Sequence, residues 1–252
     1  MTLFELMGLL STIAMILPIL FLLTTRLAWY KCFPALLIYS LLSLSYNLVS
    51  LGYINASARV VDNHHLINNL LDAPLILCFL SYFSQTAAYR RSLLIILTVY
   101  ILFEGFVVMI LGLNKTSSAI IMAPGLSIVM VVSLIFFMHY VKLTLVNQKA
   151  LGKGLMVSSI VLAYAVYSYI YVVFYLLDTQ FVNDTKLIFF LVTFFSSLVL
   201  CAGLLVERRR VKHLSELHKT REELRAIYGD DEANTTIPFE TVVFKFEKGK
   251  SF

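Results

Sequence analysis

Residues 92–113 form the stretch SLLIILTVYILFEGFVVMILGL, which contains a single ionisable side chain, Glu104. A helix needs roughly 20 mostly apolar residues to cross the hydrocarbon core of a membrane. The stretch satisfies this length, so it predicts a membrane-spanning helix.

Segments of the same kind fill most of the chain. Seven spans are predicted, over residues 3–25, 33–54, 66–87, 92–113, 119–141, 155–177 and 187–206. Their polar connections are short, such as 26–31 and 88–91, and short connections make consecutive helices antiparallel neighbours. We therefore predict an all-α fold: one seven-helix transmembrane bundle over residues 1–206, followed by a cytoplasmic tail over residues 207–252.

The overall composition excludes most other classes of protein. Of the 252 residues, 60% are apolar and 14% are charged, against about 45–50% and about 25% in ordinary soluble domains. A soluble enzyme and a disordered protein are both excluded. Cys32, Cys78 and Cys201 lie in or beside apolar stretches, so no disulfide framework of a secreted domain is expected. We expect a multi-pass integral protein of a plasma or inner membrane.

Basic side chains predict the orientation. One side of the predicted bundle carries Arg26, Lys31, Arg90, Arg91, Lys142, Lys149, Lys153 and the run Arg208–Arg210, and the other carries only Arg59, Lys115 and Lys186. Short loops rich in Lys and Arg stay on the cytoplasmic side. The N-terminus is therefore expected outside and the C-terminus inside.

Two carboxyl groups stand out because they lie far from the ends of predicted spans, Asp72 in the third and Glu104 in the fourth. An ionisable residue at the centre of a span costs at least about 2.5–3.5 kcal/mol, so it usually serves a function. Counting residues places both groups roughly 10–14 Å below the outer surface. If the two meet, they are expected to share one proton, because like charges repel.

Uncharged polar residues reach the same level from other spans. The candidate set for a ligand or proton site is Asp72, Glu104, Asn47, Asn68, Tyr167, Tyr171 and Thr193. Two interpretations remain open for it. The residues line an outward-facing pocket, or the amides and hydroxyls form a buried hydrogen-bond network that holds the helices together.

Catalytic and metal-binding patterns are not found. The histidines are His64, His65, His139, His213 and His218. Only His64 and His65 are expected near Asp72, and they do not make up the three or four converging ligands that a zinc site requires. No Gly-x-Ser-x-Gly motif is present, and no mid-span histidine is available for haem. We expect no enzyme, no metal, no cofactor and no nucleic-acid partner.

The stretch Asn68-Asn-Leu-Leu-Asp-Ala-Pro-Leu-Ile-Leu-Cys78 resembles the third helix of microbial rhodopsins, and the seven-span topology is similar. This resemblance implies that Asn68 takes the counterion-like position and that Asp72 falls near a pocket threonine. The chain departs from the family at the retinal lysine, because Leu198 stands about where that residue is expected. The tryptophans around retinal are also missing, since Trp29 is the single tryptophan. The resemblance therefore implies a lysine-free relative that forms no retinal Schiff base.

The amino-acid composition changes at Glu207, where the apolar seventh span gives way to a segment rich in Lys, Arg and Glu. Residues 207–228 predict a basic amphipathic helix whose Arg208, Arg209, Arg210 and Lys212 contact anionic lipid headgroups, with dimerisation as the alternative. Apolar and polar residues alternate over 239–247 in a way that predicts a strand. A single strand is not stable alone, so this segment would add to the edge of a partner's sheet, fold back on the inner loops or stay without order.

These features favour a receptor-like or sensory membrane protein. A small-molecule ligand or a proton would enter the outer pocket, and residues 207–252 would report to a cytoplasmic or membrane protein partner. The alternatives are a small transporter or channel that uses the intramembrane carboxyls, and a structural subunit of a membrane complex.

Overall fold

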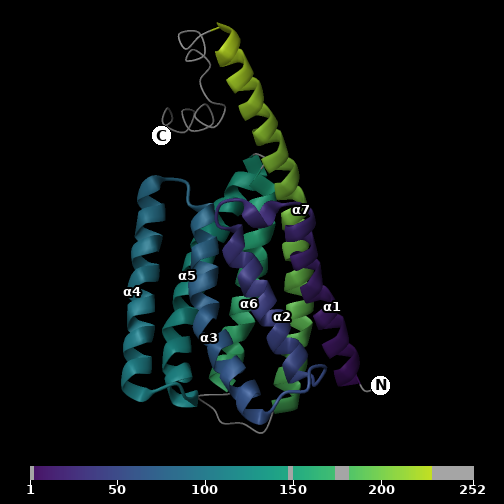
Figure 1. Cartoon of the computed structure of the whole chain (residues 1–252), viewed down its shortest axis with the longest axis vertical. Helices are drawn as coiled ribbons and strands as arrows, with labels where there is room; N and C mark the ends of the chain where they lie inside the picture. Colours follow the sequence, from purple (N-terminus) through teal and green to yellow (C-terminus); the bar gives the residue numbers. More distant parts are fainter. Residues whose placement is uncertain (1–2, 147–149, 174–181, 229–252) are drawn as a thin grey trace. The chain divides into compact units, whose positions relative to one another are not determined.

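A computed structural model describes residues 3–146, 150–173 and 182–228, and all regular structure within these ranges is helical (Figure 1). The α-helices are α1 Leu3–Thr24, α2 Phe33–Ser50, α3 Ala58–Leu80, α4 Ala87–Leu111, α5 Lys115–Val146, α6 Leu151–Tyr171 and α7 Val182–Tyr228. Two short 3-10 helices complete the described structure, η1 Leu27–Trp29 and η2 Ser81–Phe83. The all-α prediction is confirmed for the described residues.

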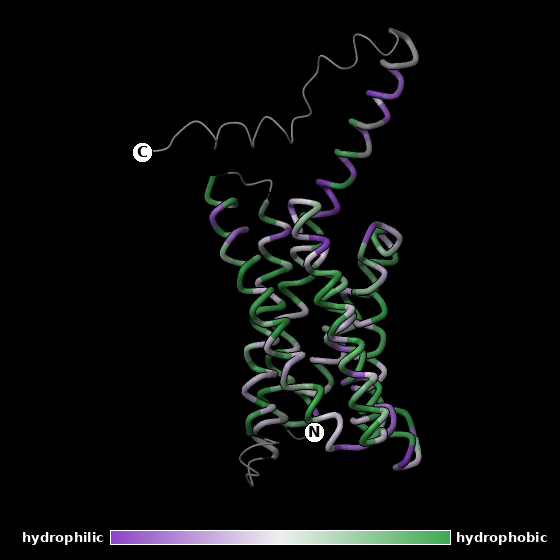
Figure 2. The backbone as a smooth tube through the Cα atoms, turned by 90° about the vertical axis from the view of Figure 1, so that its left-hand side faces the viewer, coloured by the Kyte–Doolittle hydropathy of each residue, from purple (hydrophilic) through white to green (hydrophobic). Residues whose placement is uncertain are grey.

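All seven α-helices contain a segment long and apolar enough to cross a membrane. Figure 2 shows the apolar residues along the middle of the helices and the hydrophilic residues gathered toward their ends. Length and hydropathy therefore fit the expected multi-pass membrane protein.

Several helices extend beyond the predicted spans. Helix α3 begins at Ala58 rather than at residue 66, so most of the predicted connection 55–65 is helical. Helix α5 runs from Lys115 to Val146. Hydropathy detects only the part of a helix that suits hydrocarbon, whereas helical hydrogen bonds continue through polar turns, each added residue contributing one more bond.

Contacts divide the chain into two units, Met1–Arg208 and Arg209–Phe252. Helix α7 includes the residues 207–228 that were predicted as a tail helix. The predicted strand over 239–247, and the end of the predicted sixth span beyond residue 173, lie outside the described residues.

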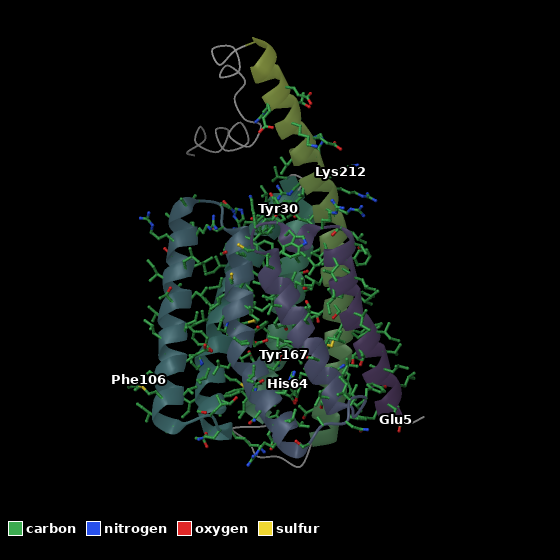
Figure 3. All side chains as sticks on the ribbon, viewed as in Figure 1. Glu5, Tyr30, His64, Phe106, Tyr167 and Lys212 are labelled. Carbon is green, nitrogen blue, oxygen red and sulfur yellow. The ribbon has the colours of Figure 1, made fainter. Side chains whose placement is uncertain are left out.

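In the first unit, consecutive helices from α1 to α6 pack as neighbours, and α3 also contacts α5. Helix α4 lies at an edge of the bundle, where it packs on α3 and α5 (Figure 1). Its outward face is apolar: Phe106 is 63% exposed and points away from the bundle (Figure 3), and Met109 is 86% exposed. Such a face is suited to contact with lipid.

One end of the bundle is filled by an aromatic cluster of Phe33, Phe79, Tyr82, Phe83 and Tyr140, all buried. Its rings contact edge to face, with centroids 4.9 Å apart for Phe33 and Tyr82 and 5.8 Å apart for Phe83 and Tyr140. The Tyr140 hydroxyl also donates a 2.8 Å hydrogen bond to the carbonyl of Phe83. The cluster joins α2, α3, η2 and α5 into one packed layer.

At the same end, α6 and α7 approach each other closely at Gly203. A Cβ atom at Gly203 would lie 2.8 Å from the backbone nitrogen of Met156 and 3.1 Å from the carbonyl oxygen of Gly152. Only glycine allows the two backbones to pack at this distance. Here Glu207 of α7 is buried and accepts a hydrogen bond from the hydroxyl of Tyr82.

Replacing Gly203 by alanine is therefore expected to push α6 and α7 apart and to destabilise the bundle by about 1–3 kcal/mol, the usual range for overpacking. Gly105 is the matched control, because a Cβ there meets nothing within 4 Å. Thermal unfolding in detergent should show a lower Tm for Gly203→Ala and an unchanged or slightly higher Tm for Gly105→Ala. Equal Tm values for the two variants would contradict the close packing.

Candidate functional site

The first unit contains a cavity of about 1100 Å³ that receives side chains from all seven α-helices. Typical pockets for small molecules measure about 300–1,000 Å³. Along α6 the cavity is lined from Tyr171 to Ser159, which is about 18 Å of helix. It therefore extends from the end of the bundle near the N-terminus deep into the membrane-spanning layer.

The structure places six of the seven predicted site residues on this cavity. They are Asn47 of α2, Asn68 and Asp72 of α3, Tyr167 and Tyr171 of α6, and Thr193 of α7. The seventh, Glu104 of α4, does not line it. Six residues of the candidate set therefore line one cavity, and the carboxyl of Glu104 does not.

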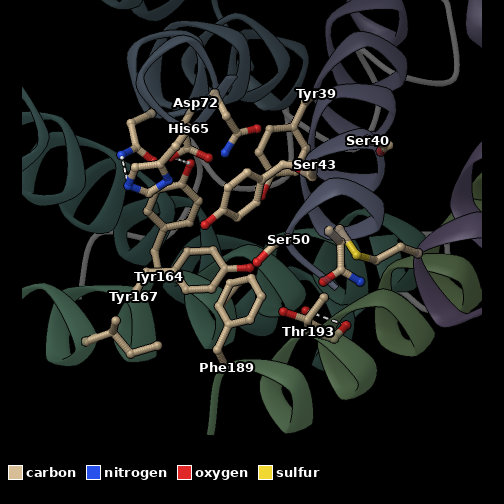
Figure 4. Close-up of a pocket in the computed structure, with 18 of the residues that line it drawn as sticks. Tyr39, Ser40, Ser43, Ser50, His65, Asp72, Tyr164, Tyr167, Phe189 and Thr193 are labelled. Carbon is tan, nitrogen blue, oxygen red and sulfur yellow. Dashed lines mark hydrogen bonds between the residues drawn. The ribbon is translucent and has the colours of Figure 1, made fainter. Parts of the chain in front are cut away.

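Of the described residues that line the deep part of the cavity, Asp72 alone is acidic. Its Oδ2 atom accepts a 2.7 Å hydrogen bond from the hydroxyl of Tyr164, and Figure 4 shows the two side chains facing each other. Within the described part of the chain, Oδ1 accepts no hydrogen bond and Asp72 forms no ion pair. The side chain lies in mid-helix yet is only half-buried, because one face is turned to the cavity.

Aromatic rings surround this carboxyl. Tyr164 and Tyr167 meet edge to face with centroids 5.8 Å apart, and Tyr167 stacks on Phe189 of α7 at 5.7 Å. Tyr39 of α2 extends into the same space from the opposite wall (Figure 4). Asp72 thus lies in a cage of tyrosines between α2, α3 and α6.

Three residues of this cage were missing from the predicted set: Tyr39, Tyr164 and Phe189. A signal existed for two of them. Tyr164 precedes Tyr167 and Tyr171 at helical spacing, and Tyr39 stands eight residues, about two turns, before Asn47. Phe189 belongs to an apolar run that gives no such pattern.

Other polar residues of the set hold helices together. Asn47 is 2% exposed, and its amide donates a 2.8 Å hydrogen bond to Thr12 of α1, whose own hydroxyl donates to the carbonyl of Gly8. The Tyr171 hydroxyl donates to the carbonyl of Ala119 in α5 at 3.0 Å. For these two residues the structure supports the hydrogen-bond network, whereas Asp72, Asn68 and Tyr167 present surface to the cavity.

The outer part of the cavity is polar and reaches water. Glu5, Asp62 and Lys115 line it and are exposed, as is Tyr53, at 55%. Deeper along α3, the amide of Asn69 lies 3.2 Å from His65 and donates to Ser118 at the same distance. The cavity therefore changes from a charged mouth to a chamber whose described lining carries one charged group, Asp72.

Glu104 lies in a different environment. It is 4% exposed and follows Leu93 and Tyr100 on the buried stripe of α4, which packs on α3 and α5. Its Oε1 atom is buried with no hydrogen-bond partner among the described residues. Tyr100 separates the two regions: it lines the cavity, and its hydroxyl donates a 3.1 Å hydrogen bond to the carbonyl of Ile121.

Among the described residues, no group of three or more His, Cys, Asp or Glu side chains is placed to hold a metal ion.

Comparison of the sequence with known protein families and curated proteins, and of the fold with solved structures, gives no match.

A cysteine at position 68 should be open to water, because Asn68 faces the cavity, whereas the preceding residue, Ile67, is exposed on the outer surface of the bundle. In a protein whose native cysteines are replaced by alanine, a charged, membrane-impermeant methanethiosulfonate reagent should label Asn68→Cys at least about ten times faster than Ile67→Cys, since thiolates form in water rather than in lipid. Equal rates would contradict a water-filled cavity.

Proposed function

We propose that this chain is a receptor-like membrane protein that binds a small molecule in the cavity around Asp72. The observation that carries the proposal is a deep, aromatic cavity lined by Asp72, one of whose carboxyl oxygens accepts no hydrogen bond from the described residues. A buried charge at membrane depth is costly unless it serves a function. A large, mostly apolar pocket with a few converging polar groups is the usual form of a small-molecule site.

The closed end of the bundle supports binding over conduction. Leu36 and Ile76 line the inner end of the cavity. Each lies about one helical turn from a member of the aromatic cluster, Leu36 from Phe33 on α2 and Ile76 from Phe79 on α3. Those two rings are fully buried and lie 5.5 Å apart. A continuous pore would require this packed layer to open.

Helix α7 is the proposed output element. It lines the cavity with Phe189 and Thr193, and in the same unit its Glu207 accepts the hydrogen bond from Tyr82 in the aromatic cluster. A ligand that shifts α7 at the cavity therefore also acts on the Glu207–Tyr82 contact. The helix then continues to Tyr228, which gives a route to the segment proposed to meet a partner.

The proposed orientation places the cavity mouth outside and α7 beyond Glu207 in the cytoplasm, following the distribution of basic residues. Arg208, Arg209 and Lys212 are exposed, and Lys212 pairs with Glu216 at 3.8 Å on the helix surface. With Arg210, these cations are proposed to bind anionic lipid headgroups. The ligand is held without a lysine Schiff base, as the rhodopsin resemblance implies, and Leu198 does not line the cavity.

Native mass spectrometry of protein extracted in mild detergent tests the proposal. We expect a small molecule on the wild type, at least about tenfold less of it on Asp72→Asn, because a charged hydrogen bond contributes about 1.5–3 kcal/mol, and an unchanged amount on Glu104→Gln, which alters a carboxyl away from the cavity.

Two results would contradict the proposal. One is protein that stays empty after extraction and shows no thermal shift with a library of small molecules. The other is ion-gradient-dependent flux through reconstituted wild-type protein, which would establish the transporter or channel instead.

A further inference from the structure

We propose that the cavity selects an organic cation, an amine whose charged nitrogen lies between Asp72 and the surrounding tyrosine rings. This inference rests on the proposed function and adds the chemical class of the ligand. It starts from the charges on the cavity lining. Among the described residues that line the cavity, Glu5 and Asp62 lie at the mouth and Asp72 lies inside, whereas Lys115, at the mouth, is the single Lys or Arg.

The position of Asp72 excludes an anionic ligand. It lies ten residues beyond Asp62 on α3, which is about 15 Å of helix, and the described cavity lining around it contains no Lys or Arg. An organic anion in this chamber would meet a carboxyl and no compensating charge. A cation instead supplies the partner that Oδ1 lacks among the described residues, and Tyr164 holds Oδ2 so that Oδ1 keeps its direction.

The aromatic walls suit the same charge. A cation is attracted to the electron-rich face of a tyrosine ring within about 6 Å of its centroid. Tyr164 and Tyr167 stand at 61° to each other, so their faces form two sides of a corner, and Tyr39 faces this corner from α2 (Figure 4). Rings at an angle around a carboxylate are the arrangement by which proteins bind ammonium groups.

The size and the remaining walls define the rest of the ligand. A volume of about 1100 Å³ is far larger than a metal ion needs. The inner wall carries apolar side chains, among them Met15, Leu36, Ile76 and Leu126, interspersed with serine hydroxyls such as Ser159 and Ser197. The ligand is therefore an amine with an apolar body, whose charged end points to Asp72 and whose body packs on this wall.

The test uses two fluorescent probes of similar shape, the cation 4-(4-dimethylaminostyryl)-1-methylpyridinium and neutral 4-dimethylaminostilbene, titrated against full-length protein in nanodiscs of zwitterionic lipid. We expect the wild type to bind the cation at least about tenfold more tightly. Asp72→Asn should weaken cation binding by about 10- to 100-fold and leave the neutral probe unchanged, which also shows that the variant is folded. Glu104→Gln, a matched carboxyl change away from the cavity, should leave both affinities unchanged.

A second pair of variants tests the rings. Tyr167→Leu should weaken the cation by about 3- to 10-fold, whereas Tyr167→Phe, which keeps the aromatic face, should retain it. Equal affinity for the two probes, insensitive to Asp72→Asn, would overturn the cation assignment and leave the small-molecule site standing. Saturable binding of neither probe would contradict both this inference and the proposed function.

Discussion

The hydrocarbon core of a membrane offers no hydrogen-bond partner to backbone or side-chain polar groups. The arrangement of these seven apolar helices follows from that constraint. Each helix satisfies its own backbone, and apolar side chains such as Phe106 and Met109 are left facing outward. Polar side chains are turned inward: Tyr100 and Glu104 are buried on α4, the helix that carries Phe106 and Met109 on its outward face. A bundle built in this way concentrates its chemistry between the helices.

The inward polar groups fall into two kinds. Asn47 and Tyr171 find partners on neighbouring helices, through Thr12 and the carbonyl of Ala119, and so hold the bundle together. Asp72 is satisfied at one oxygen by Tyr164 and presents the other to a cavity. Holding the helices together does not require a carboxyl oxygen that faces a cavity at this depth. Asp72 is for this reason the residue on which the proposed function depends.

Sequence alone predicted the seven helices and singled out Asp72 as a candidate site residue, because hydropathy and the cost of a charge act locally along the chain. It also placed Glu104 at a depth similar to that of Asp72, since depth follows from counting residues. The face of a helix that meets the cavity depends on how the helix is rotated in the packed bundle. For that reason Glu104 lies away from the cavity, and only the structure shows that Tyr39, Tyr164 and Phe189 line the same cavity as Asp72.

The most direct measurement is an electron cryo-microscopy map of the full-length protein, enlarged with a bound antibody fragment and purified in mild detergent. The account predicts density that belongs to no protein atom, within hydrogen-bond distance of Asp72 Oδ1 and against the Tyr167 ring. A map in which the helices close on the cavity, or in which a protein side chain occupies that position beside Oδ1, would contradict the account.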